Sequence, residues 1–354
     1  MVGEVIVTVL TCTARSDPRW AFMADSIALQ PENLLAESEW VIVDAKLWTE
    51  PEKRKAEVHD ATRALRDIGM QIVHIPPKPC RWQGPARLTK SDYFALSNAR
   101  NTGLVVARGQ RIIAVDDCSV VADNWMQGHL RFGLEAIVCA AFYTYRSATV
   151  VDGKIVKGDP GVYGLDARVK VKPEVGRTNA GWAYGLSCSY PLEAAIAANG
   201  GDESYDGQGG SEDSDFGIRM ERCGYPAWWN PEPLVYQILE SHEPVFEHVG
   251  WDLPQKPKRV PKELRVRRDE KCHFGNEVLA ERLVLDDIGR TQPANSIILT
   301  EWQGHPHPGV EYRIGHPFSL REMREEYKAT GKIPKHPFVS DVDWRDGKPL
   351  SEMG

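Results

Sequence analysis

The sequence lacks a long apolar run. None of its 354 residues lies in a stretch near the roughly 20 apolar residues of a membrane span. Val5–Leu10 is apolar but too short even for the core of a signal peptide, and a strand is the better interpretation. We therefore expect no membrane span and a cytoplasmic location.

Paired cysteines are also missing. The seven cysteines are odd in number and form no Cys-x-x-Cys pair. This excludes the usual spacing of a zinc module and argues against a disulfide framework. A reducing compartment, again the cytoplasm, is the natural expectation.

The chain has no overall excess of basic charge. Its net charge of −7 argues against a surface that coats nucleic acid along its whole length, but a local basic patch remains possible. Residues 256–271 form such a patch, with Lys256, Lys258, Arg259, Lys262, Arg265, Arg267, Arg268 and Lys271. A charge run of this kind is most often a solvated arm, and the alternative is a binding site for a polyanionic acceptor.

Strand and helix patterns alternate through the first half of the chain. Strands are predicted at Val5–Leu10, Trp40–Val43, Gln71–Ile75 and Arg111–Val115. Helices are predicted from an Asp17-Pro18 cap to Gln30, over Pro51–Ile68 with Gly69 closing it, and from a Ser91 cap through Arg100. Repeated units of this kind predict an α/β fold, an open and mostly parallel sheet with helices on both faces.

The pattern then changes. Ala136–Tyr145 is apolar and rich in β-formers, and a hairpin tip follows at residues 151–154. Short helices are predicted at Pro191–Asn199, Asp213–Arg222 and Leu320–Thr330. We expect a main domain over residues 1–253, a basic linker or arm over 254–274, and a C-terminal extension of unknown fold over 275–354.

Two acidic clusters carry the chemistry. The apolar run Arg111–Val115 ends in Asp116-Asp117, at the strand tip where α/β sheets place ligands. The second cluster, Glu212-Asp213-Ser214-Asp215, follows Gly209-Gly210 and opens a helix. The first suits a divalent metal that carries phosphates, and the second suits a general base. The plainer alternatives are a turn cap and a helix cap.

Several motifs occur in a characteristic order. Asn98-Ala99-Arg100-Asn101-Thr102-Gly103 precedes Ala107-Arg108-Gly109 and the Asp116-Asp117 strand end, and Gly200-Gly201-Asp202-Glu203 precedes the second cluster. Over about residues 4–250 this order resembles inverting GT-A glycosyltransferases of the family 2 type. The second cluster also resembles the Gly-Gly-Glu-Asp-Asp-Asp segment of galactosyltransferases that share the fold.

The resemblance implies a binding site for a nucleoside-diphosphate sugar, most naturally a UDP sugar. Its expected donor contacts are Thr11, Thr13, Arg15, Asp44, Arg100 and Asp116. Asp44 stands where similar enzymes place a carboxylate on the imino N–H of uracil. The alternatives are a surface loop for Arg15, a cap for Asp44 and a structural ion pair for Arg100.

The resemblance also implies Mn²⁺ or Mg²⁺, with Asp117 as a ligand. Cys118 stands where the family often has a third acidic residue, and a thiol is a poor ligand for a hard cation. His248 is the expected further ligand, with His242 as its competitor and a structural histidine as the alternative.

Asp213 is the expected base, and Glu212 is expected to assist by holding the acceptor hydroxyl. Asp202, Glu203 and Trp182 are candidate acceptor or sugar contacts, although a tryptophan is more often part of a core.

The sequence thus predicts a metal-dependent inverting glycosyltransferase that acts on a saccharide or other hydroxyl acceptor. One alternative is transfer to hydroxymethylated bases in DNA, as in small viral enzymes that modify DNA. A non-catalytic binder of sugar nucleotides is another. A nucleotidyltransferase is disfavoured, because Thr11-Cys12-Thr13-Ala14-Arg15 is not a glycine-rich basic loop.

Overall fold

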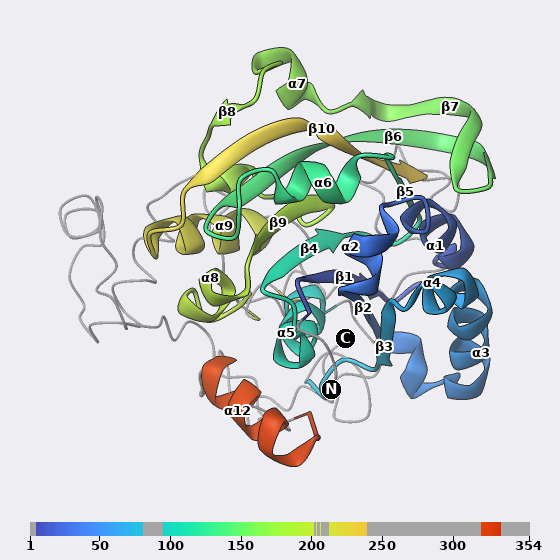
Figure 1. Ribbon diagram of the computed structural model, residues 1–354, viewed down its shortest axis with the longest axis vertical. Helices are drawn as coiled ribbons and strands as arrows, with labels where there is room; N and C mark the ends of the chain where they lie inside the picture. The colour runs from blue at the N-terminus through green and yellow to red at the C-terminus, as the bar shows by residue number, and fades with distance from the viewer. Residues whose placement is uncertain are drawn as a thin grey trace, which may run out of the picture. The chain divides into compact units, whose positions relative to one another are not determined.

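The structure is a computed structural model that describes residues 5–80, 95–201, 203, 206, 212–238 and 320–333. The chain forms two compact units, each built from separate segments (Figure 1). Unit 1 takes in residues 1–76, 107–192 and 226–257, and unit 2 takes in residues 77–106, 193–225 and 258–354. Each unit is described by itself.

Unit 1 is built on one sheet. Its main path has the strand order β3-β2-β1-β4-β9-β6-β10-β5, while β7 pairs with β6 and β8 pairs with β10. The strands are β1 (Val7–Thr13), β2 (Ser38–Asp44), β3 (Gln71–Ile75), β4 (Arg111–Val115), β5 (Ser119–Val121), β6 (Ile137–Val151), β7 (Lys154–Leu165), β8 (Gly176–Arg177), β9 (Ser187–Pro191) and β10 (Ala227–Ile238).

The predicted open, mostly parallel sheet is confirmed. In the described part of the chain β1, β2, β3, β4, β6 and β10 run in one direction, and β5, β7, β8 and β9 run against them. The carboxyl ends of β1, β2 and β4 therefore lie at one edge. The antiparallel β9 begins at this same edge, because Ser187 pairs with Val115.

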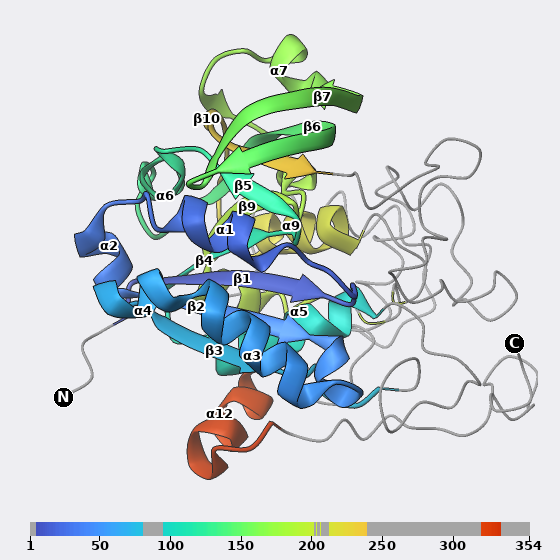
Figure 2. The same ribbon diagram turned by 90° about the vertical axis from the view of Figure 1, so that its right-hand side faces the viewer.

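Helices α1 (Trp20–Ile27), α2 (Glu32–Ala36), α3 (Pro51–Ala61), α4 (Arg63–Ile68) and α6 (Trp125–Leu130) contribute side chains to the core of unit 1. The other described helical segments of the unit are α7 (Ala167–Val171) and the 3₁₀ turns η1 (Ala45–Trp48) and η2 (Ala180–Trp182). Alternate strand residues such as Val7, Val9 and Ile113 pack against Trp20 and Trp125. Figure 2 shows α1, α3 and α4 ranged along β1, β2 and β3. Burying this apolar surface is the main driving force for the unit.

Two helix predictions need correction. Asp17 does not cap α1: the helix begins after Arg19, which adopts a left-handed φ of 57°, and Asp17 instead accepts a hydrogen bond from the Arg19 amide. The single helix predicted over Pro51–Ile68 is two helices that meet at Thr62. The Thr62 hydroxyl donates to the Val58 carbonyl at 2.7 Å, a bond that bends or ends helices.

Gly109 brings β1 and β4 together. A Cβ at this position would lie 2.3 Å from the Thr8 nitrogen, and the Gly109 amide donates to the Thr8 hydroxyl at 2.9 Å. The adjacent Arg108 forms an ion pair with the buried Glu39 of β2. Through these contacts with β1 and β2, the Ala107-Arg108-Gly109 turn fixes the start of β4 beside β1.

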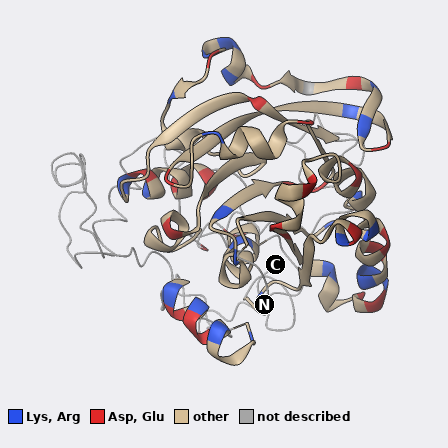
Figure 3. Cartoon of the chain, in the orientation of Figure 1, with Lys and Arg blue, Asp and Glu red and all other residues tan. Residues whose placement is uncertain are grey.

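Unit 2 contains the described helices α5 (Leu96–Val106), α9 (Glu212–Arg222) and α12 (Leu320–Thr330), and all but the first residue of α8 (Leu192–Ala197). The predicted helix Leu320–Thr330 is confirmed. Arg324 of α12 donates to the Leu104 and Val105 carbonyls of α5, and the Leu320 amide donates to Asn199. Both acidic and basic residues lie on α12 and on α3 (Figure 3). No helix in the described ranges is long and apolar enough to cross a membrane.

A buried histidine should make unit 1 sensitive to acid. His129 of α6 is fully buried, and its Nδ1 lies 3.0 Å from the Ser189 hydroxyl, which also accepts from Arg111. Burial, and next the charge of Arg111, lower the pKa of His129 to about 3. His129 is therefore neutral in the folded protein.

We predict that the free energy of unfolding decreases as the pH falls below about 6.5, because His129 binds a proton in the unfolded chain but stays neutral in the folded protein. Between pH 7 and pH 5 this group alone lowers the free energy of unfolding by about 2 kcal/mol. Urea titrations across that range should show a weaker pH dependence in His129→Gln. The exposed His59→Gln is the control, and equal slopes for all three proteins would contradict the prediction.

Candidate functional site

The candidate donor site lies at the carboxyl edge of the unit 1 sheet. Residues 14–18 follow β1, Asp44 ends β2, and Asp116-Asp117 follow β4. Because these strands are parallel neighbours, the three segments meet at one edge. This is the position where open α/β sheets bind ligands.

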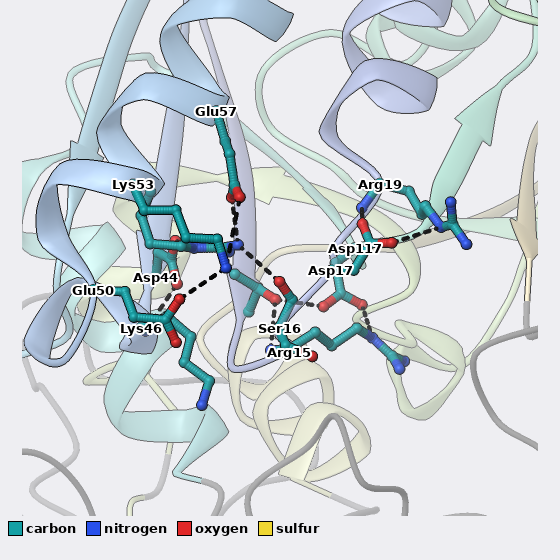
Figure 4. Close-up of polar contacts among 12 residues, drawn as sticks. Arg15, Ser16, Asp17, Arg19, Asp44, Lys46, Glu50, Lys53, Glu57 and Asp117 are labelled. Atoms are coloured by element: carbon teal, nitrogen blue, oxygen red, sulfur yellow. Dashed lines mark hydrogen bonds and ion pairs between the residues drawn. The ribbon is translucent and has the colours of Figure 1, made fainter.

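Asp117 is held by two residues from the end of β1. Its Oδ1 accepts from the Arg15 Nε at 2.8 Å, and its Oδ2 accepts from the Thr13 hydroxyl at 2.6 Å. The Thr13 oxygen also accepts from the Arg15 amide at 3.1 Å. Figure 4 shows Arg15 beside Asp117, with the far end of its guanidinium turned away from the carboxylate. Both oxygens of Asp117 therefore already accept short hydrogen bonds.

Arg15 stays charged in this setting. Only 1% of its surface is exposed, and burial by itself lowers its pKa. The negative charge of Asp117, with smaller contributions from Cys118 and Asp116, outweighs burial and raises the pKa above its usual value. The edge thus contains a fixed, buried guanidinium.

Asp44 lies in a second buried ion pair. Its Oδ2 accepts from the Arg54 Nε at 2.7 Å and lies 3.2 Å from the His74 Nε2, while its Oδ1 accepts from the Lys46 amide at 2.9 Å. The Arg54 Nη2 is buried without a hydrogen-bond partner among the described residues. Such an atom calls for an explanation, and an absent ligand is one. Sequence reasoning missed Arg54 and His74, because neither lies in a motif.

The other donor candidates differ in their surroundings. Thr11 is fully buried, and its hydroxyl accepts from the Trp40 Nε1 at 3.0 Å, which gives it a packing role. Asp116 is half-buried at the tip of β4. Donor contact for both residues stays a prediction.

Trp182 lies in an aromatic cluster on the loop that leads into β9. Its ring packs edge-on against Trp229 with 5.4 Å between ring centroids. The buried Arg168, paired with Asp166, lies over Tyr184 and Trp229 as well as over Trp182. These contacts favour a role for Trp182 in the core. The residue is half-buried, and it lies at the start of the loop that leads into β9 at the candidate edge.

In unit 2 the Asn98–Gly103 motif of α5 contacts both the segment that contains Gly201 and Glu203 and the start of α9. Arg100 of α5 pairs with Glu212 of α9 at 3.3 Å. Asn101 binds both backbone groups of Gly201, each at 2.8 Å, and donates to Glu203 at 2.9 Å. Glu203 also pairs with the buried Lys78 at 2.6 Å. The sequence had suggested sugar contact for Glu203, and its visible role is to anchor this loop.

Asp213 and Asp215 have different environments on α9. Asp213 is half-buried, and its Oδ1 accepts from the Ser214 amide at 2.7 Å. Asp215 is buried beside Arg219 at 3.0 Å, and Arg219 also donates to the Gly200 carbonyl. Burial raises the pKa of Asp215, with Arg219 opposing that rise. Asp215 is therefore structural, and of the two Asp213 is the better placed to exchange a proton.

Several predicted residues lie outside the described residues, namely Asp202, His242, His248 and the basic segment 256–271. Among the described residues, no group of three or more His, Cys, Asp and Glu side chains is arranged to hold a metal ion. With Asp117 already engaged by Arg15 and Thr13, the described side chains do not fit a divalent cation as they stand.

Comparisons with known proteins find structural neighbours alone. No family model matches the chain, and a search of curated proteins finds no match. S. aureus TarS residues 1–349 aligns at 13% identity over 66% of this chain and 60% of its own, with a TM-score of 0.43. The same fragment with UDP aligns at 14% identity over the same shares of the two chains, with a TM-score of 0.41.

GalNAc-T7 with UDP, GalNAc and Mn²⁺ aligns at 13% identity over 85% of this chain and 54% of its own, with a TM-score of 0.46. The aligned region thus spans about half to three fifths of these proteins. The neighbours are GT-A glycosyltransferases, the group that the sequence motifs resemble. At TM-scores below 0.5 the likeness does not place the chain in a family, and the activity must be argued from its own residues.

The Asp44–Arg54 pair should matter for stability, because removing one partner leaves a buried charge. We predict that Asp44→Ala lowers the free energy of unfolding by about 3 kcal/mol, the lower end of such losses, since Glu57 still pairs with Arg54. The double variant Asp44→Ala/Arg54→Met should regain part of this loss. Urea denaturation measures both, with the exposed Glu52→Gln as control. An Asp44→Ala midpoint equal to that of the control would contradict the prediction.

Proposed function

We propose that this protein transfers a glycosyl group from a nucleoside-diphosphate sugar to an acceptor hydroxyl. The observation that carries the proposal is the carboxyl edge of β1, β2 and β4, where a buried arginine and two strand-end aspartates meet. Arg15 offers a cation for phosphate, and Asp44 with Arg54 offers an acceptor and a donor for a base edge. The ordered motifs of α5, β4 and α9 agree with this activity.

The donor is proposed to be a UDP sugar. Uracil presents one imino N–H between two carbonyl oxygens, which matches a carboxylate beside a guanidinium. The Arg54 Nη2, which has no hydrogen-bond partner in the part of the chain that the structure describes, supports a carbonyl acceptor at this position. Asp44 and Arg54 would then select the base, and Arg15 would hold the diphosphate.

Transfer is proposed to occur in one displacement. The acceptor oxygen attacks the anomeric carbon as the bond from that carbon to the diphosphate oxygen breaks, and the configuration inverts. Asp213 accepts the proton of the attacking hydroxyl, and the nucleoside diphosphate leaves with the bonding electrons. The half-buried position of Asp213 on the first turn of α9 supports this role. Glu212 pairs with Arg100 and would orient the acceptor side.

A divalent metal stays a prediction from the sequence. Asp117 with His248 would be its ligands, and Mn²⁺ is present in the GalNAc-T7 structure. A bound metal would offset the charge of the leaving diphosphate. Because the described residues do not fit such an ion as they stand, no step above depends on one.

The acceptor is proposed to be a saccharide or another small hydroxyl compound. DNA with hydroxymethylated bases is the alternative, and it depends on residues 256–271, outside the described residues. A cytoplasmic location accords with either acceptor and is likewise a prediction. A non-catalytic binder of sugar nucleotides remains the competing class, and loss of turnover in an Asp213 variant separates it from an enzyme.

The donor proposal predicts a selective thermal shift. UDP and UDP sugars should raise the melting temperature of the wild type more than CDP, ADP or GDP compounds, because a ligand of the native state stabilises it. The panel is run with EDTA and with Mn²⁺, so that it reports binding under either condition. If no nucleotide shifts the melting temperature in either buffer, the proposed donor site is wrong.

The catalytic proposal predicts that Asp213→Asn spares donor binding and removes transfer. An amide cannot accept the proton, so the transfer rate should fall by about 10²- to 10⁴-fold. Release of nucleoside diphosphate is measured with an acceptor panel. Glu221→Gln, on the same helix, is the matched control. A near wild-type rate in Asp213→Asn would refute the assignment of the base.

A further inference from the structure

The guanidinium of Arg15 lies where the sequence pattern predicts a metal ion. We infer that Arg15, anchored by Asp117, is the cation that binds the donor diphosphate, so that donor binding needs no divalent metal. The inference rests on the proposed function and deepens it. It changes the role of Asp117 from a metal ligand to the anchor of an arginine.

The first support is the engagement of Asp117. Its two oxygens accept from Arg15 and Thr13 at 2.8 and 2.6 Å, and the side chain is 8% exposed. Each oxygen keeps a second lone pair. The carboxylate faces a guanidinium, however, so a metal ion bound at the same oxygen would lie against a positive charge.

The second support comes from Cys118. It occupies the position of a third acidic ligand and has a positive φ of 58°. Its amide donates to the Pro18 carbonyl at 3.0 Å, and its sulfur lies 3.8 Å from the Asp17 carbonyl oxygen. Its own carbonyl accepts from the Ile238 amide at 2.9 Å. Cys118 thus ties the loop after β1 to β10, and its thiol is a poor partner for Mn²⁺ or Mg²⁺.

The third support is the setting of Arg15. Its guanidinium is buried, and attraction to an anion is stronger in a buried position than in water. A guanidinium also presents a planar set of donors that matches phosphate oxygens. Its Nε donates to Asp117 at 2.8 Å, and the far end of the group is turned away from that carboxylate (Figure 4). Because 1% of Arg15 is exposed, the ligand must displace what covers it.

The wild type gives the first test and needs no variant. Calorimetric titration with UDP and with UMP is done in EDTA and in Mn²⁺. We expect the affinity for UDP in EDTA to stay within about threefold of that in Mn²⁺, and to exceed that for UMP by about tenfold. If UDP binds in the Mn²⁺ buffer but not in the EDTA buffer, the inference is wrong and the proposed function still stands. No binding of any nucleotide in either buffer would overturn both.

The second test separates a phosphate contact from a structural role. Arg15→Gln should lower the affinity for UDP about tenfold in EDTA and leave the affinity for UMP nearly unchanged. The variant should then bind UDP and UMP with nearly equal affinity, so that the UDP preference is lost. Arg15→Lys should restore part of the preference because it keeps the charge. Arg131→Gln, which removes an exposed arginine paired with Glu232, is the control. A folded Arg15→Gln protein that retains the UDP preference would refute the inference. If that variant does not fold, the wild-type titration still decides.

Discussion

The ion pair between Arg15 and Asp117 is the interaction on which the candidate donor site depends. It joins the loop after β1 to the tip of β4, two segments about a hundred residues apart in sequence. The Thr13 hydroxyl also donates to Asp117, and the Cys118 amide donates to the Pro18 carbonyl in the loop after β1. Replacing a buried pair of this kind by apolar residues is often neutral or stabilising, so its better attested value is in fixing one arrangement. Here that arrangement places a guanidinium at the ligand-binding edge.

The same design recurs through the chain. Asp44 has Arg54, Asp166 has Arg168 and Asp215 has Arg219, each pair buried. In each pair the arginine also donates to a backbone carbonyl of another segment, namely Ser16, Ala140 and Gly200. A guanidinium has five donors, so it can bind a carboxylate and hold a loop at once. The buried arginines therefore serve as joints between loops and the elements behind them.

The sequence predicted the elements whose pattern is local. The apolar runs of β3 and β4 are found at the predicted bounds, and the parallel direction of the first four strands follows from the alternation of strands and helices. The break at Thr62 was missed because a hydroxyl bond to the preceding turn leaves no mark in hydrophobic periodicity. The hairpin tip predicted at residues 151–154 joins β6 to β7, but the extent of β7 and the strands β8, β9 and β10 were missed. Gly158 and Gly161 pack closely against Tyr145 and Thr144. Because glycine has no side chain, these positions interrupt the apolar alternation that identifies a strand.

Sequence motifs alone do not reveal which residues surround the candidate site. Asp44, Asp117 and Asp213 were found from their places at strand and helix ends, since such places follow from the local pattern. Arg15 and Arg54 pair with Asp117 and Asp44 from other segments, and Lys78 and Asn101 likewise contact Glu203. Tertiary contacts alone reveal what each of these residues does. An unpaired Asp116-Asp117 would present two negative charges and favour a cation. Once Arg15 neutralises one of them, the edge is less acidic than the sequence suggests and more suited to phosphate. The meaning of an acidic motif therefore depends on which basic residue the fold brings to it.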